Sequence, residues 1–282
     1  MSVTVVTDSS AYLPAELAAA ADLTVVPLYV RVGSLSGVEG VDVTPADVAR
    51  ALGERRVDVS TSRPSPADFV AAYRRVLDGG ASGVVSVHLS RHLSGTYESA
   101  TLAARQFPRG AVRVVDSRST AMGLGFAVLA AAEVAAEGGS VHEVQLVAEA
   151  CAARTTTLFC VDTLEHLRRG GRIGAAAALI GTALAVKPIL EMVDGVVVVK
   201  ERVRTSGRAL ARLEELAVEA AGEGPVDVAV HHLDAADRAG ALHAHLAASL
   251  GERARLVVSE LGAAVGAHVG PGVVGVVVLP RT

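Results

Sequence analysis

The chain has 282 residues and a formal net charge of −4, and 51% of its residues are hydrophobic although only 3% are aromatic. This length suits one large or two modest domains, and the charge gives no basic footprint for nucleic acid. The interior has to be aliphatic, because the sequence contains no Trp. Such an interior suits an alkyl ligand, although any chain rich in alanine and valine also folds in this way.

Cysteine spacing and hydrophobic stretches exclude further classes of protein. Cys151 and Cys160 form no C-x-x-C pair, so neither a disulfide framework nor a zinc site is expected. The N-terminal segment lacks the basic start and the apolar core of a signal peptide. The longest uncharged apolar stretch, Ile173–Val186, is shorter than the about 20 residues that span a bilayer. We therefore expect a cytoplasmic protein without a transmembrane segment.

The first half of the chain alternates strands with helices. Strands are predicted over Val3–Asp8, Leu23–Val32, Gly83–Leu89 and Val112–Ser117. Helices are predicted to follow Pro14, to start at Thr44-Pro45 and Ser65-Pro66, to span Gly95–Phe107, to end near Glu137 and to start again at Ser140. This alternation predicts a doubly wound, mainly parallel α/β sheet.

The pattern changes near residue 155. A strand over residues 155–162 and a helix over Thr163–Arg169 precede two apolar runs, which Asp194-Gly195 joins into a predicted β-hairpin. Helices Ser206–Ala221 and Ala235–Leu250 and strands Val226–His231, Ala254–Val258 and Val273–Leu279 complete the chain. We therefore expect an N-terminal α/β (Rossmann-like) domain over residues 1–155 and a C-terminal α+β domain over residues 156–282.

Motifs for nucleotide, metal and hydrolase sites are either absent or stand in the wrong structural context. Gly270–Gly275 matches G-x-G-x-x-G, but it opens a valine-rich strand, whereas a dinucleotide site needs these glycines between a strand and a helix. The sequence has no G-K-[ST] phosphate loop and no H-E-x-x-H zinc motif. G-x-S-x-G is also absent, so no nucleophile elbow supports an α/β-hydrolase. We expect no metal and no cofactor.

Polar clusters rich in Ser and Thr stand where predicted strands end. They are Asp8-Ser9-Ser10, Ser60–Ser65, Leu93–Thr96 and Asp116–Ser119. In an open α/β sheet, ligands bind beyond the carboxyl ends of the strands. Ser94 and Gly95 also precede a helix, where free backbone N–H groups favour an anion. The alternative is that these hydroxyls only cap helices, and that His268, before the last strand, only closes a turn.

Taken in order, these motifs resemble the DegV family. The matching segments are TDSSAYLP, STSRPSPADF, LSGTYESA, VDSRSTAMGLG, CVDTLEHLRRGGRIG, AVKPIL, VRTSGRAL and HVGPGVVGV. The resemblance covers about residues 3–280, and it depends on the order and spacing of the motifs rather than on any single one. Arg63, Arg91 and Gly174 depart from residues that are common in the family, but none of them replaces a carboxylate ligand.

The resemblance implies two domains and a long-chain fatty acid, such as palmitate, stearate or oleate, in an apolar tunnel whose mouth lies near the interdomain cleft. The carboxylate would be held by Thr61, Ser94 and His268. Further polar residues of the mouth would be Ser9, Ser62, Gly95, Thr96 and Ser117.

The resemblance also implies a function as the acyl-binding subunit of a fatty acid kinase, without catalytic activity of its own. A separate ATP-binding kinase subunit would phosphorylate the carboxylate to acyl-phosphate for phospholipid synthesis. Arg172 and Arg204 would then dock that partner or aid phosphoryl transfer. No nucleic acid is expected as a partner, and any contact with a membrane should be transient.

Two other functions remain open from the residues alone. One is a lipid esterase or acyltransferase with Ser94 as nucleophile, His268 as base and Asp8 or Asp116 as the orienting carboxylate. The missing nucleophile elbow counts against it. The other is a regulatory α/β protein that senses a small anion such as phosphate.

Overall fold

The computed structural model describes residues 2–54, 57–179 and 186–281, which form two compact units. The first unit joins Met1–Tyr29 with Ser62–Arg154, and the second joins Val30–Thr61 with Thr155–Thr282. Residues 30–61 thus group with the second unit, whereas the sequence prediction placed them in the N-terminal domain. Residues 180–185, which belong to the second half of the apolar stretch Ile173–Val186, lie outside the described residues. None of the described helices has the length and apolar character needed to cross a membrane.

The first unit is built on a four-stranded parallel sheet with the order β2-β1-β6-β7. Its strands are β1 (Val3–Asp8), β2 (Leu23–Val26), β6 (Gly83–His88) and β7 (Val112–Asp116). All six residues of β6 are buried, as expected for a parallel strand covered on both faces. The strand order reverses between β1 and β6, so the ligand-binding crevice of such a sheet is expected where these two strands end.

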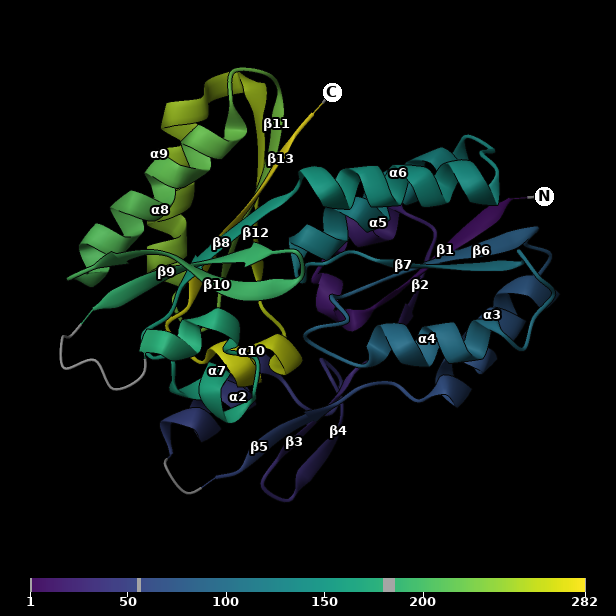
Figure 1. Ribbon diagram of the computed structural model, residues 1–282, viewed down its shortest axis with the longest axis horizontal. Coiled ribbons are helices and arrows are strands. Elements are labelled where there is room, and N and C mark those ends of the chain that lie inside the picture. The colour runs from purple at the N-terminus through teal and green to yellow at the C-terminus, as the bar shows by residue number, and fades with distance from the viewer. Residues whose placement is uncertain (1, 55–56, 180–185, 282) are drawn as a thin grey trace. The chain divides into compact units, whose positions relative to one another are not determined.

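Helices cover both faces of this sheet. They are α3 (Pro66–Asp78), α4 (Thr96–Ala104), α5 (Met122–Ala136) and α6 (Val141–Arg154), with η1 (Ser9–Ala11) and the short α1 (Ala15–Ala20) between β1 and β2. Figure 1 shows α5 and α6 on one face and α3 and α4 on the other. This arrangement confirms the predicted doubly wound fold. The predicted caps are also present, since Ser65 caps α3 and Ser140 pairs with Glu143 at the start of α6.

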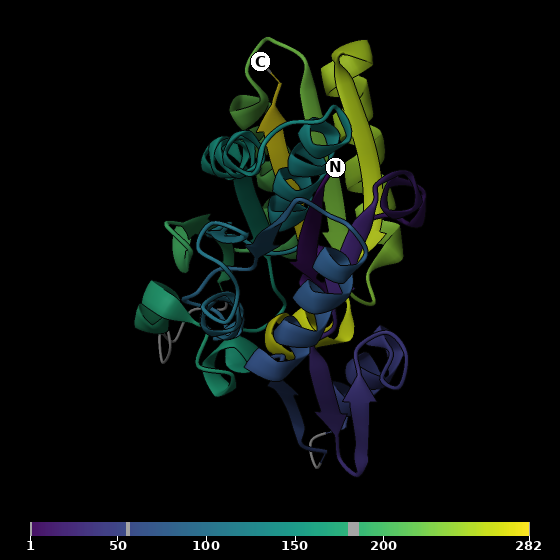
Figure 2. The same ribbon diagram turned by 90° about the vertical axis from the view of Figure 1, so that its right-hand side faces the viewer.

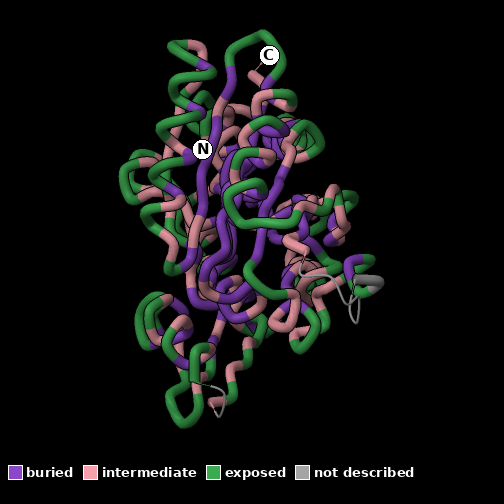
Figure 3. The backbone as a smooth tube through the Cα atoms, turned by 90° about the vertical axis from the view of Figure 1, so that its left-hand side faces the viewer, coloured by how far each residue is buried: buried purple, intermediate pink, exposed green. Residues whose placement is uncertain are grey.

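The second unit contains a six-stranded mixed sheet with the order β10-β9-β8-β13-β11-β12. Its strands are β8 (Thr156–Cys160), β9 (Lys187–Val193), β10 (Val196–Val203), β11 (Val226–His232), β12 (Ala254–Glu260) and β13 (Val274–Pro280). The helices α8 (Ser206–Ala221) and α9 (Ala236–Leu250) pack on one face over an aliphatic core. Figure 3 shows that buried residues follow the strands while exposed ones gather on helices and loops. The hairpin at Asp194-Gly195 is confirmed, with β9 and β10 antiparallel.

A three-stranded sheet also contributes to the second unit. It consists of β4 (Leu35–Val38), β3 (Tyr29–Val32) and β5 (Val59–Ser62), in that order. The single strand predicted over Leu23–Val32 is wrong, because Pro27 has no N–H group for a ladder and the chain leaves the first sheet there. Near this sheet stand α2 (Pro45–Gly53), α7 (Glu165–Arg169) and α10 (Ala263–Val269), and α10 packs against both α2 and α7. Figure 2 shows α10 in yellow at this place.

Candidate functional site

Thr61 and His268 form a polar pair within the second unit. Thr61 lies in β5, His268 lies in the last turn of α10, and Thr61 Oγ1 is 2.9 Å from His268 Nε2. The first turn of α10 is fixed as well, because the Ala264 amide donates to the buried Glu39 carboxylate over 2.7 Å. Two residues that are 207 positions apart are therefore brought together, as predicted for a shared site, and the Thr61 hydroxyl does not serve as a helix cap.

The surroundings of His268 fix its charge and its tautomer. Burial, with a smaller contribution from the Arg172 guanidinium, lowers the pKa of His268 to about 4, so the ring is neutral at pH 7. Nδ1 is buried and has no hydrogen-bond partner among the described residues. Because buried N–H groups are rarely left unpaired, we assign the proton to Nε2, which donates to Thr61 Oγ1. The Thr61 hydroxyl proton is then free to donate to a ligand.

Two glycines of the second unit make room for imidazole rings. A Cβ at Gly170 would overlap His268 Nδ1 and lie 2.9 Å from Cε1. A Cβ at Gly270, which has a φ of +78°, would lie 2.8 Å from His166 Nε2. The G-G-R-I and H-V-G-P-G motifs therefore pack against each other, each glycine against the other segment's histidine. Sequence reasoning missed this role of Gly170, which leaves the space that the His268 ring occupies.

Ser94 belongs to the loop that follows β6 in the first unit. Its Oγ lies 2.9 Å from Thr96 Oγ1, and Thr96 is buried. The residue that precedes α4 is Gly95, and no side chain caps this helix. The cap interpretation is therefore wrong for Ser94, whereas it is right for Ser65. The start of α4 keeps free N–H groups beside the two hydroxyls, an arrangement that suits an anion.

A fully buried polar chain lies beneath this loop. Tyr73 Oη donates to Ser86 Oγ over 2.8 Å, and Ser86 Oγ lies 2.6 Å from His88 Nε2. His88 Nδ1 lies 2.9 Å from Asp8 Oδ2, and all four side chains are inaccessible to solvent. Burial raises the pKa of Tyr73, which keeps the phenol a donor. The donors therefore run in one direction, from the phenol through the serine and the imidazole to the carboxylate.

The Asp8 carboxylate also ties two loops together at the point where the strand order reverses. It accepts hydrogen bonds from the backbone amides of Ser10 and Leu89, both over 3.1 Å. Ser90, the next residue, accepts from the Ser94 amide over 3.2 Å. Asp8 thereby holds the loop that carries Ser94. Sequence reasoning missed His88, although a histidine inside an apolar strand was a visible signal.

The other residues predicted for the mouth are engaged within loops or exposed. The Ser9 hydroxyl accepts from the Leu28 amide over 3.0 Å, and the Ser117 hydroxyl, which is buried, donates to the Ser119 carbonyl over 3.3 Å. Ser62 is exposed. Asp116, one carboxylate of the esterase alternative, forms an ion pair with Arg91 over 2.7 Å. Both carboxylates of that alternative, Asp8 and Asp116, are thus already occupied within the first unit.

The two arginines predicted for a partner differ in their surroundings. Arg172 is half-buried and donates to the Gly170 carbonyl, close enough to His268 to affect its pKa. Arg204 is exposed and stands between β10 and Thr205, whose side chain caps α8. Arg172 therefore belongs to the surroundings of the imidazole, whereas Arg204 is available at the surface of the second unit.

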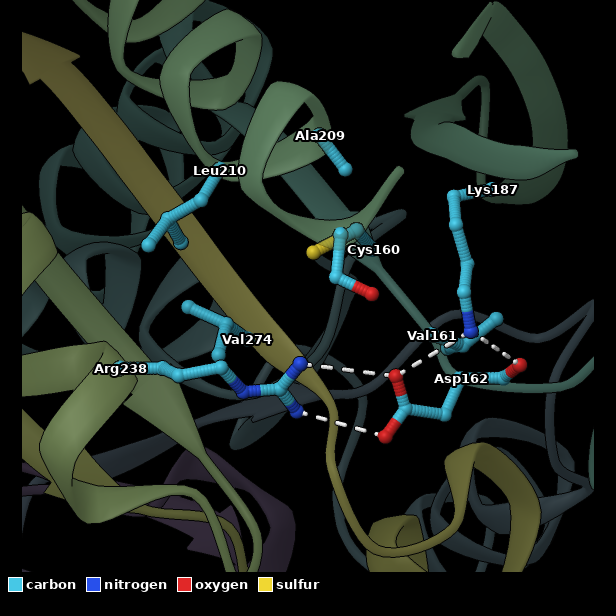
Figure 4. Close-up of a pocket in the computed structure, with 9 residues that line it drawn as sticks. Cys160, Val161, Asp162, Lys187, Ala209, Leu210, Arg238 and Val274 are labelled. Carbon is cyan, nitrogen blue, oxygen red and sulfur yellow. Dashed lines mark hydrogen bonds and ion pairs between the residues drawn. The ribbon is translucent and has the colours of Figure 1, made fainter. Parts of the chain in front are cut away.

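Two cavities, one in each unit, lie away from these polar residues. Asp162 lines a cavity of about 10 Å³ in the second unit, and its Oδ1 lies 3.5 Å from Arg238 Nη1 and from Lys187 Nζ. Figure 4 shows the two cationic side chains on either side of this carboxylate. This volume admits about one water molecule and no acyl chain. A groove of about 410 Å³ in the first unit is lined by α1, α5 and the start of β1, the end opposite to Asp8. No group of three potential metal ligands occurs in the described part of the chain.

Together, the fold and these contacts define a two-unit α/β protein whose loops carry hydroxyl, imidazole and backbone amide groups. A family model described as "Uncharacterised protein, DegV family" matches residues 2–281. The chain belongs to the DegV family. A DegV domain-containing protein of Streptomyces coelicolor is 53% identical over 279 residues, which cover 99% of both chains.

Solved structures agree with this assignment over the full length. A DegV family protein from Thermus thermophilus, whose structure is described as showing fatty acid binding, is 36% identical with a TM-score of 0.94, and the match covers 100% of both chains. DegV from Bacillus subtilis, described as a fatty acid binding protein, is 32% identical with a TM-score of 0.90, again over 100% of both chains.

Proposed function

We propose that this protein binds a long-chain fatty acid in an apolar tunnel and presents the carboxylate to a separate ATP-dependent kinase subunit. In this proposal Thr61 and Ser94 donate to the carboxylate, and His268 contributes through its hydrogen bond to Thr61. The observation that carries it is the Thr61–His268 pair, which leaves a hydroxyl proton free beside a neutral imidazole. The fatty acid binding described for the relatives from Thermus thermophilus and Bacillus subtilis supports the choice of ligand.

The energetics of an acyl ligand require such donors. Each buried CH₂ contributes about 0.8 kcal/mol, so about fifteen methylenes give a gross gain near 12 kcal/mol before the cost of association. A carboxylate without hydrogen bonds would offset much of this gain. Hydroxyl donors from Thr61 and Ser94 reduce that cost, and the neutral His268 keeps the Thr61 hydroxyl oriented.

The kinase part of the proposal assigns the nucleotide to another protein. The sequence has no phosphate-binding G-K-[ST] motif. The hydrocarbon part of the fatty acid undergoes no reaction, so the proposal requires no catalytic residue in this protein. Arg172 and Arg204 would dock the kinase subunit or stabilise the transferred phosphoryl group, and the acyl-phosphate would feed phospholipid synthesis. This assignment places the protein in the cytoplasm, where ATP is available to the partner.

The carboxylate site can be tested with delipidated protein and palmitate. Thr61→Ala and Ser94→Ala should each weaken binding by about tenfold, the effect of one hydrogen bond to a charged group. Ser36→Ala, in the exposed part of β4, should leave the affinity unchanged. Wild-type affinity in both single variants and in the double variant would refute the assignment of these hydroxyls.

The partner role is tested by acyl-phosphate formation with the kinase subunit and ATP. Arg172→Ala and Arg204→Ala should lower the rate while fatty acid binding persists. Arg255→Ala, an exposed arginine in β12, serves as the control and should leave the rate unchanged. Loss of fatty acid binding in both arginine variants would contradict the separation of the two roles.

A further inference from the structure

Arg63 is packed in an unusual way against the start of α4. A Cβ at Gly95 would overlap Arg63 Nη1 and would lie 2.8 Å from Cζ and 2.9 Å from Cδ. Gly95 has an ordinary φ of −75°, so its backbone conformation does not require glycine. The terminal atoms of the arginine side chain lie along the Gly95 backbone, in the space that a side chain at this position would occupy.

This cation lacks a counter-charge. Arg63 has no ion pair or hydrogen bond to any residue that the structure describes, and its side chain is exposed. Arg91, in the loop between β6 and α4 that carries Ser94, differs, because it pairs with Asp116 over 2.7 Å and stacks 4.1 Å from the centre of the Tyr97 ring. The charge of Arg91 is therefore balanced by the Asp116 carboxylate, whereas the charge of Arg63 is not balanced by any residue that the structure describes.

The position of Arg63 favours the binding of an anion. The N-terminus of α4 carries a partial positive charge and no side-chain cap, and the guanidinium adds a full positive charge beside it. Two like charges at one place disfavour each other, and a bound anion would reverse that effect. Ser94 and Thr96, with hydroxyls 2.9 Å apart, stand at the same helix start.

The different burial of these side chains indicates which of them would face the carbonyl end of an acyl-phosphate and which would face its phosphoryl end. Thr96 is buried, Ser94 is half-buried and Arg63 is exposed. The acyl carbonyl carbon is joined to the buried chain, so the phosphoryl group is the outer part of the headgroup. The guanidinium fork matches phosphate oxygens in geometry as well as in charge.

We propose that Arg63 binds the phosphoryl group of the acyl-phosphate, and that it distinguishes this product from the free fatty acid. This inference rests on the proposed function, because it takes Ser94 as a ligand of the headgroup. Arg63 acts by binding the product and takes no part in bond making.

The test compares two ligands on delipidated protein. One is palmitate, and the other is 2-oxoheptadecylphosphonate, in which a CH₂ replaces the bridging oxygen of palmitoyl phosphate. Arg63→Gln should weaken binding of the phosphonate by about tenfold or more, the effect of losing a charged hydrogen bond, and change palmitate binding by less than about threefold. Arg63→Lys should bind the phosphonate more weakly than the wild type and more tightly than Arg63→Gln, because lysine keeps the positive charge but not the planar guanidinium group.

Arg113→Gln, an exposed arginine in β7 of the same unit, is the matched control and should bind both ligands like the wild type. Equal losses for both ligands in Arg63→Gln, or no loss for either, would overturn the inference. A wild type that binds palmitate but not the phosphonate would also overturn it while leaving fatty acid binding intact. A wild type that binds neither ligand would refute the proposed function and this inference together.

Discussion

Replacing His268 should remove a defined part of the pH dependence of stability. Burial lowers the pKa of this imidazole from 6.5 to about 4 in the folded protein. Between these values the unfolded chain binds a proton that the folded protein does not bind, so the free energy of unfolding falls as the pH decreases. The loss attributable to His268 is about 2 kcal/mol at pH 5 relative to pH 7.5, and it approaches about 3 kcal/mol below pH 4.

Urea unfolding of delipidated protein at pH 7.5 and pH 5 measures this loss. In His268→Gln the new side chain keeps an N–H group that can reach Thr61, but it does not titrate. The decrease in the free energy of unfolding between pH 7.5 and pH 5 should therefore be about 2 kcal/mol smaller in this variant than in the wild type. His245→Gln, an exposed residue beside Glu214, should behave like the wild type. An identical loss in His268→Gln and the wild type would show that the imidazole is not buried in its neutral form.

The remaining contacts give two further predictions. Asp8→Asn should lower the free energy of unfolding by about 3 kcal/mol, because it removes the charged acceptor of the hydrogen bonds from His88 and the Leu89 amide; a decrease below about 1 kcal/mol in urea unfolding would contradict the role of this carboxylate. Gly170→Ala should weaken palmitate binding by about tenfold, because the methyl group displaces His268 from Thr61. Gly207→Ala, where a Cβ meets no atom within 4 Å, should bind palmitate normally, and equal affinities in the two glycine variants would argue against the displacement.

The sequence predicted those parts of the fold that depend on local patterns. The Ser65-Pro66 and Ser140–Glu143 signals start helices because capping involves only neighbouring residues. Asp194-Gly195 forms the predicted hairpin for the same reason. The helix over Ser206–Ala221 appears with the predicted bounds, because its apolar face repeats regularly along the chain.

Contacts between distant segments could not be predicted in this way. The grouping of residues 30–61 with the second unit depends on packing between α2 and α10, and the short β4 and α10 carry weak patterns of their own. The pairing of Thr61 with His268 came from the family resemblance rather than from any periodicity. The Asp8–His88 chain requires a parallel register between β1 and β6 that no local signal contains.

The central claim is that the protein holds a long-chain acid by its carboxylate, and the most direct measurement is mass spectrometry of lipid extracted from the purified protein. The account predicts a co-purifying fatty acid of about fourteen to eighteen carbons at close to one per chain, with acyl chains of that length giving the largest burial term. The Thr61→Ala, Ser94→Ala double variant should carry much less. A wild-type protein free of such an acid, which also fails to take up added palmitate, would contradict the account.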